Sequence, residues 1–320
     1  MEHVRKVLLT FAANNKKIMA SLPKMTGLAG AKGWLCGLGA ALFYGFIPFF
    51  TLPLKAAGVG NPSILFYRFF TAAVVLACVM KVRGVSFRVT RGEMVTLLYL
   101  AFISDGSALF LLDSYTYMPT GVATTLHFLY PVITTLIMIV FYHEARRATT
   151  FLAVAMAVGG VAVLSWQDGA MLSVKGVVIA VISAVCYALY LIRVNRSRAQ
   201  KMEGLKVVFY VMAAGSMIFL ADALRQDALQ PIPDLRAAGY VLALAVVCTV
   251  VTNLMVVASV KRIGSTITSI LGALEPLTAV VVGCLLLGEP FTLSVAGGLA
   301  LIIPAIVIII LTRGRQAKAG

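Results

Sequence analysis

The sequence predicts an all-α membrane protein whose ten transmembrane helices form two inverted repeats of five, with both termini in the cytoplasm. Composition is the first observation: 61% of the 320 residues are hydrophobic and 12% are charged, whereas soluble domains carry about 25% charged residues. The second is a series of apolar stretches near the roughly 20 residues that a transmembrane helix needs. The third is a sixteen-residue segment that recurs 145 residues later. The predicted spans are residues 33–52, 62–80, 94–117, 120–142, 149–166, 174–193, 205–221, 237–259, 264–287 and 292–312.

The basic residues lie mostly in alternate loops. When successive loops are assigned to opposite sides of the membrane, one side holds 22 of the 27 Lys and Arg residues and the other holds four. Cytoplasmic loops are enriched in Lys and Arg, so both termini are predicted to be cytoplasmic. The net charge of +15 is then explained by topology. The expected surroundings are a lipid bilayer, and no nucleic-acid partner is predicted.

The chain begins with a basic amphipathic segment, residues 1–30, that is predicted to lie in the cytoplasm. Its apolar run "VLLTFAA" is short for a signal peptide, and "NNKK" follows where small residues would be needed for cleavage. A helix here would place apolar side chains on one face and Lys and Arg on the other, which suits an interfacial helix on an anionic leaflet. A frayed basic tail is the alternative. Residues 313–320 form a cytoplasmic tail at the other end.

Two five-span repeats are predicted over residues 31–166 and 174–312. The segments "LYPVITTLIMIVFYHE" (129–144) and "LEPLTAVVVGCLLLGE" (274–289) share a proline at the third position and a glutamate thirteen residues after it. Nearer the start of each half the offset is 143. Because five is odd, the second repeat must cross the membrane in the opposite sense to the first. Inverted repeats around a site near the midplane are typical of secondary transporters that work by alternating access.

Several of these motifs together resemble the drug/metabolite transporter superfamily, EamA type. They are Arg68 and Phe69 in "YRFF" of the second span, a mid-span proline in spans four and nine, and the glutamates of "HE" and "LLLGE". The resemblance covers about residues 30–312. It implies a ten-helix carrier, commonly an exporter of amino acids or other small metabolites, in a bacterial inner (cell) membrane.

Two carboxylates are the leading candidates for substrate binding, because ionisable groups inside a span are rare and usually functional. Glu275 lies near the midplane of span nine beside Pro276, which frees a backbone carbonyl. Asp105 lies about as deep in span three and is followed by Gly106 and Ser107. Either could bind a substrate ammonium group or a proton, and either could instead be paired with a neighbouring helix. Sharing one cavity would favour proton uptake by one of them.

Other polar side chains are predicted to line the same cavity. Tyr130 is the repeat partner of Glu275, and His127 precedes it by about one helical turn. Hydroxyl and amide groups often hold membrane helices together, so packing is the alternative for each. The further candidates are Tyr44, Tyr187, Asn253, Thr124 and Ser269.

A second set is predicted to act in gating or structure. Arg68 and Asp113 have similar depth and opposite charge, which predicts an ion pair that either locks two helices or opens as an extracellular gate. Pro131 and Pro276 are predicted hinges or kinks. Glu144 and Glu289 are expected to bond helix ends or loops at opposite membrane faces.

Other classes of function fit the sequence less well. No paired aspartates in a protease motif, HExxH, nucleotide loop or GxSxG occurs, and the five cysteines lie in spans without a CxxC pair. No enzyme activity, catalytic residue, metal or cofactor is therefore predicted. A channel lacks a filter signature but remains an alternative. The predicted function is secondary transport of a small organic solute, most simply amino-acid export, driven by gradients of substrate, protons or both.

Overall fold

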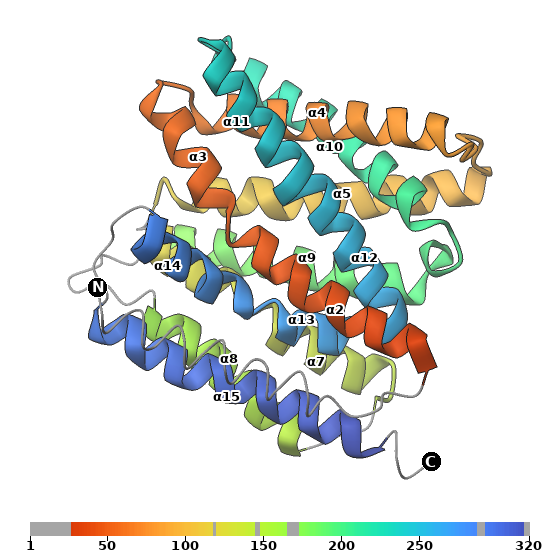
Figure 1. Ribbon diagram of the computed structural model, residues 1–320, viewed down its shortest axis with the longest axis vertical. Helices are drawn as coiled ribbons and strands as arrows, with labels where there is room; N and C mark the ends of the chain where they lie inside the picture. The colour runs from red at the N-terminus through yellow and green to blue at the C-terminus, as the bar shows by residue number, and fades with distance from the viewer. Residues whose placement is uncertain (1–26, 118–119, 145–147, 165–172, 287–291, 317–320) are drawn as a thin grey trace.

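The computed structural model describes residues 27–117, 120–144, 148–164, 173–286 and 292–316, and all regular structure in these ranges is helical (Figure 1). The predicted N-terminal segment up to residue 26, Glu289 and the end of the C-terminal tail lie outside them. The helices of the first half are α2 (Gly27–Tyr44), α3 (Ile47–Ala56), α4 (Asn61–Val82), α5 (Arg91–Ser114), α6 (Thr120–His127), α7 (Tyr130–Phe141) and α8 (Ala148–Leu164). Those of the second half are α9 (Val174–Arg196), η1 (Arg198–Gln200), α10 (Gly204–Arg225), α11 (Leu235–Ala245), η2 (Val246–Val251), α12 (Thr252–Ile263), α13 (Ser265–Leu271), α14 (Leu274–Leu286) and α15 (Leu293–Gln316).

Apolar length identifies the described helices as membrane-spanning. Seven helical segments are long and apolar enough to cross a bilayer, and Ala148–Val163 and Ala296–Ile308 are shorter apolar helices. Large apolar side chains also remain on the outside, for example Phe102, 71% exposed, and Phe141, 73% exposed. Soluble proteins rarely expose apolar patches of such extent, whereas lipid solvates them. The chain is an integral, multi-pass membrane protein.

The helix bounds themselves repeat. Helix α10 has the bounds of α4 shifted by 143 residues, and α13 and α15 begin 145 residues after α6 and α8 begin. Both repeats also contain a helix that is broken near its middle. The first break separates α6 from α7, and the second separates α13 from α14. The two-repeat architecture expected from the sequence therefore fits the structure.

Helix packing follows the same symmetry. The most extensive contacts join α8 to α15, α4 to α10, α5 to α9 and α2 to α12. Spans one to five are α2–α3, α4, α5, α6–α7 and α8, and their counterparts, spans six to ten, are α9, α10, α11–α12, α13–α14 and α15. Exchanging each span for its counterpart leaves the α8–α15 and α4–α10 contacts unchanged and converts the α5–α9 contact into the α2–α12 contact. In Figure 1, α8 and α15 lie side by side at one end of the long axis, and α4 and α10 lie near the other. The helices that surround the centre are thus drawn from both repeats.

The two related crossings at the centre are built from different residues. On α5 and α9, Ser107 and Ser183 each donate a side-chain hydrogen bond to the other's backbone carbonyl, at 2.8 and 2.7 Å. On α2 and α12 the approach depends on glycine, because a Cβ at Gly37 would lie 2.8 Å from the Oγ of Ser259. We call the first contact the serine clasp. Small residues allow such close crossings between membrane helices.

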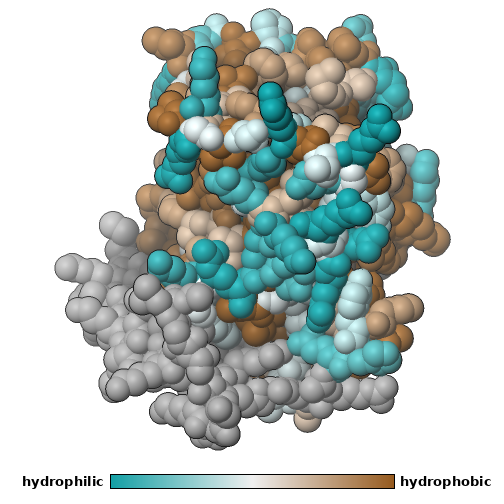
Figure 2. All heavy atoms as spheres, turned by 90° about the vertical axis from the view of Figure 1, so that its right-hand side faces the viewer, coloured by the Kyte–Doolittle hydropathy of each residue, from teal (hydrophilic) through white to brown (hydrophobic). Residues whose placement is uncertain are grey.

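The basic loops gather at one end of the helices. The Nζ of Lys206 donates to the Arg88 carbonyl at 2.9 Å, and the side-chain amide of Gln200 donates to the Lys261 carbonyl at 2.9 Å. The first bond joins the loop after α4 to the first turn of α10, and the second joins η1 to the last turn of α12. Figure 2 looks onto this end, where hydrophilic side chains form a broad band.

Candidate functional site

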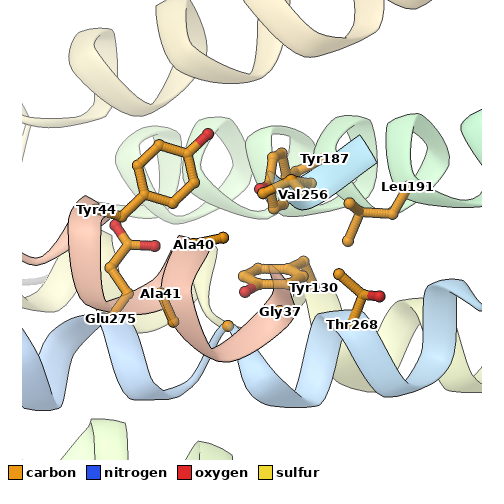
Figure 3. A pocket seen from close by; sticks show the side chains of 11 residues that line it. Gly37, Ala40, Ala41, Tyr44, Tyr130, Tyr187, Leu191, Val256, Thr268 and Glu275 are labelled. Atoms are coloured by element: carbon orange, nitrogen blue, oxygen red, sulfur yellow. The ribbon is translucent and has the colours of Figure 1, made fainter. Parts of the chain in front are cut away.

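A small cavity lies at the centre of the helices. Side chains of α2, α7, α9, α12, α13 and α14 line it, so both repeats contribute to its wall (Figure 3). Its volume is about 20 Å³, which leaves room for about one water molecule. An organic solute could enter only after these helices separate.

Glu275 supplies the acidic group of the cavity. It is the second residue of α14, directly after the break at residues 272–273, and Pro276 follows it. Figure 3 shows its carboxylate beside Tyr44 at one end of the cavity. Among the described residues, no side chain donates a hydrogen bond to this carboxylate. Its position in the first turn of a helix also favours negative charge there.

Tyrosine rings form the middle of the cavity. The rings of Tyr130 and Tyr187 meet edge to face with centroids 4.8 Å apart, a favourable aromatic geometry. The Tyr130 hydroxyl occupies the space where a side chain at Gly272 would begin, so the glycine beside the helix break permits this packing. The two aromatic residues and Glu275 therefore meet at the break in the second repeat.

Arg68 is held by a distorted part of span eight. Its Nε donates to the Oγ1 of Thr249 at 2.5 Å, and its Nη2 donates to the Cys248 carbonyl at 3.1 Å. Both acceptors belong to η2, a π-helical segment, and π-helical turns are frequent at functional sites. Arg68 also lies close enough to Glu275 for their charges to attract, although the two do not form a direct ion pair.

A hydrogen-bond chain joins Arg68 to the cavity. The Tyr44 hydroxyl donates to the Oδ1 of Asn253 at 3.3 Å, and the Asn253 amide donates to the Thr249 carbonyl at 2.8 Å. Thr249 in turn accepts from Arg68 through its hydroxyl, which itself donates to the Leu244 carbonyl at 3.0 Å. This chain, from Tyr44 through Asn253 and Thr249 to Arg68, links spans one, eight and two.

Among the described residues, Arg68 and Asp113 do not form the expected ion pair. Asp113 is exposed, and its charge reaches the ammonium group of Lys175 at the start of α9. The expectation rested on equal depth in the membrane, but depth does not fix the direction in which a side chain leaves its helix. Arg68 instead faces span eight.

Asp105 does not share a cavity with Glu275. It is fully buried on α5 against Gly215 of α10, and it is absent from the cavity wall. Its two carboxyl oxygens have no hydrogen-bond partner among the described residues. The two acidic groups predicted at similar depth are therefore separate sites.

Three residues predicted to line the cavity, His127, Thr124 and Ser269, are not part of its wall. The Nδ1 of His127 hydrogen-bonds to Ser183 at 2.9 Å, and its ring packs against Tyr130 and Tyr187 with centroids 5.6 Å away in each case. Thr124 hydrogen-bonds to the Tyr115 hydroxyl at 3.3 Å. Ser269 is buried and donates to the Thr266 carbonyl at 2.8 Å. They support the tyrosines and α13 from outside the cavity.

Pro131, Pro276 and Glu144 lie at or just beyond the ends of helices. Pro131 is the second residue of α7 and Pro276 the third residue of α14, so each follows a break in its span. The Glu144 carboxylate accepts a hydrogen bond from the Thr266 hydroxyl at 2.7 Å, at the start of α13. This contact joins the end of span four to the start of span nine.

Sequence reasoning missed three contributors to the site. Thr249 and the Cys248 carbonyl lie in "VVCTVV", whose apolar pattern gives no sign of a π-helical turn. Gly272 had a signal, because a glycine three residues before Glu275, in "GALEP", marks a point of close approach.

Apolar spans, a two-repeat arrangement and a central cavity between broken helices define a multi-pass membrane transporter. The chain belongs to the EamA-like transporter family, whose family model matches residues 31–166 and again residues 174–311. It is 26% identical over 208 residues to the uncharacterized transporter YvbV of Bacillus subtilis (strain 168). The aligned region covers 64% of this chain and 67% of the relative. A crystal structure 17% identical in sequence superposes with a TM-score of 0.76, covering 88% of this chain and 98% of that one, and shows the shared fold.

Proposed function

We propose that this protein is a secondary transporter that exports amino acids or related small metabolites by alternating access, with the central cavity as its substrate site. The observation that carries the proposal is the position of Glu275 in the cavity wall, where no described side chain donates to it, with the charge of Arg68 close enough to attract it. A solute with an ammonium and a carboxylate group would match both charges. The family membership supports transport of a small solute.

The surroundings of Glu275 favour an amphipathic solute. Tyr44, Tyr130 and Tyr187 line the cavity together with the apolar side chains of Leu191 and Val256. Aromatic rings can pack against the apolar part of a solute, and they also attract an ammonium group over their faces. An anionic solute such as a nucleotide sugar would meet Glu275 with the wrong charge.

The volume of the cavity supports an occluded state. About 20 Å³ is far below the 300 Å³ or more of typical ligand pockets, so the substrate requires a more open conformation. The breaks before α3, α7 and α14 all lie beside the cavity and provide joints for such a movement. In this proposal the two repeats exchange conformations, and the cavity opens first to one side and then to the other.

The membrane arrangement in this proposal has ten spans and cytoplasmic termini. The seven long apolar segments, the two shorter helices and the broken α13–α14 pair together account for ten. The basic end of the helices would face the cytoplasm, as cytoplasmic loops are rich in Lys and Arg, and the membrane would be a bacterial inner (cell) membrane. Transport would use a gradient of substrate, protons or both.

The test is counterflow in proteoliposomes preloaded with a panel of unlabelled neutral amino acids. The wild-type protein should accumulate a labelled amino acid from the panel, and Glu275→Gln should reduce the initial rate at least tenfold, because the amide cannot pair with an ammonium group. Glu93→Gln is the matched control. Glu93 lies in the first turn of α5, where it forms a capping box with Thr90, and it is not part of the cavity wall. The glutamine variant should therefore keep the wild-type rate.

Two outcomes would overturn the proposal. Absence of exchange for every amino acid in the panel would exclude this substrate class. Unaltered exchange in Glu275→Gln would remove the cavity carboxylate from the substrate path.

A further inference from the structure

The buried Asp105 occupies a slot that excludes other groups. It is 0% exposed, and in the part of the chain that the structure describes neither of its carboxyl oxygens has a hydrogen-bond partner. The wall of the slot is Gly215 of α10, where an added Cβ would lie 2.7 Å from the Oδ2 of Asp105 and 2.8 Å from the ring of Phe69. The slot therefore fits one carboxyl group, and a methyl group at position 215 would have to displace that carboxyl or the Phe69 ring.

No described group compensates a negative charge in this slot. From α4 the neighbour is Phe69, whose ring packs on Phe219 with centroids 4.6 Å apart. Arg68, the adjacent residue of α4, directs its guanidinium to η2 instead. From α9 the titratable neighbour is the phenol of Tyr190, which is buried as well.

Other titratable groups on the helices and connections around α5 have contacts of their own, and Cys78 of α4 and Cys186 of α9 are free thiols that carry no positive charge. On α6, His127 hydrogen-bonds to Ser183. On α10, the Tyr210 hydroxyl donates to the Phe87 carbonyl at 2.5 Å, and Asp222 pairs with Arg225 at 3.0 Å. At the η1 contact, Arg198 lies against Gly92 at the first turn of α5.

The chemistry of the slot selects among possible ligands. A buried carboxylate needs a cation or several donors, and a bound metal ion would need further ligands. In the described part of the chain, no group of three or more His, Cys, Asp or Glu side chains could hold a metal ion. A proton needs no further ligand, because the neutral carboxylic acid requires far less solvation than its anion.

We propose that Asp105 is a proton-binding site, separate from the substrate cavity, that holds one proton while α4, α5 and α10 are packed together. Protonation forms one O–H bond on the carboxylate and consumes one proton. Release leaves the anion, which requires water and hence separation of α5 from α10. The role in coupling rests on the proposed transport function, whereas the proton occupancy of Asp105 does not.

A short structural path joins this site to the cavity. Ser107, two residues after Asp105, forms the serine clasp with Ser183 of α9. Tyr187 lies one helical turn further along α9 and lines the cavity. Movement of α5 at Asp105 would therefore move the α9 wall of the cavity.

The first experiment measures proton occupancy without a substrate. Infrared spectra of purified wild-type protein, Glu275→Gln and Asp105→Asn are compared at neutral pH for the C=O stretch of a protonated carboxyl group. One component of the band should be present in the wild type and in Glu275→Gln and missing in Asp105→Asn, whose side chain has the same shape but cannot titrate. A band that persists unchanged in Asp105→Asn would overturn the proposal.

The second experiment measures coupling in proteoliposomes. Asp105→Asn should keep counterflow at equal pH within about threefold of wild type, yet lose at least tenfold of the accumulation driven by a pH gradient. Retained gradient-driven accumulation, or equal loss of both activities, would overturn the coupling role. If wild-type protein transports no member of the panel, the proposed function fails, and the infrared result still decides whether Asp105 holds a proton.

A second variant keeps the proposal testable if Asp105→Asn does not fold. Gly215→Ala keeps the carboxyl group and adds a methyl group that meets its oxygen. It should shift the frequency of the carboxyl band relative to wild type, and an unshifted band would overturn the assignment.

Discussion

Replacement of Thr249 by valine tests whether the π-helical segment positions Arg68 for substrate binding. Valine has nearly the shape of threonine, but it lacks the hydroxyl that accepts from the Arg68 Nε at 2.5 Å and donates to the Leu244 carbonyl at 3.0 Å. One of the two hydrogen bonds of the guanidinium is lost, and the bond to the Cys248 carbonyl at 3.1 Å remains. Arg68 should then turn away from the place where a substrate carboxylate would bind.

The expected magnitude follows from the bond that is removed. A hydrogen bond to a charged group contributes about 1.5–3 kcal/mol, and each 1.4 kcal/mol changes an equilibrium constant about tenfold. The concentration of amino acid for half-maximal exchange should therefore rise about ten- to a hundredfold. The maximal rate should change much less, because Glu275 and the helix breaks are unaltered.

The assay is equilibrium exchange of a labelled amino acid in proteoliposomes at a series of concentrations. Thr249→Ser is the matched control, because serine keeps the hydroxyl and should stay within about threefold of wild type. A half-saturation value for Thr249→Val that equals the wild-type value would refute the reasoning. An equal loss in both variants would refute it as well, since it would indicate that packing, and not the hydroxyl, is required.

Two further predictions concern the helix break and the end of the molecule opposite the basic loops. Gly272→Ala places a methyl group where the Tyr130 hydroxyl lies; overpacking typically costs about 1–3 kcal/mol, so exchange should fall at least fivefold, and adding Tyr130→Phe should restore most of it. A double variant no better than the single one would contradict this contact. Ser63 accepts from the Gln230 amide at 2.8 Å and donates to the Ala228 carbonyl at 2.8 Å. Loss of one hydrogen bond costs about 1 kcal/mol, so Ser63→Ala should speed hydrogen exchange of the Gln230 backbone amide about fivefold. An unchanged rate would show that Ser63 does not hold the segment after α10 against α4.

Hydropathy and internal similarity predicted much of the fold. The length of an apolar stretch locates a helix because a helix that crosses the bilayer needs about 20 apolar residues. Pro131 and Pro276 mark the breaks because proline has no backbone N–H to donate to the helical hydrogen bond. The break between α2 and α3 precedes Pro48 by the same logic, yet the sequence reasoning treated that span as continuous. The π-helical turn had no signal, because its hydrogen-bond register depends on what packs against it.

The site was predicted less completely than the fold, for one geometric reason. Position along a span gives the depth of a side chain, but its direction around the helix axis is set by packing. Glu275 and Tyr130 were placed together because the repeat relates them, and both line the cavity. Asp105 and Asp113 were assigned mainly by depth in the membrane; Asp105 lies against Gly215 and not in the cavity wall, and Asp113 is exposed.

The unequal central crossings have a consequence for the resting state of a carrier with exchanging halves. Identical repeats would give two access states of equal free energy. Here the serine clasp stabilises one crossing with two reciprocal hydrogen bonds, whereas its counterpart has close contact at Gly37 and the single longer bond from Tyr44 to Asn253 at 3.3 Å. With about 0.6 kcal/mol per bond between membrane helices, one bond more gives a difference of about 0.6 kcal/mol, or roughly a threefold bias in population. Under the proposed alternating access, the empty protein would therefore be found more often open to one side of the membrane than to the other.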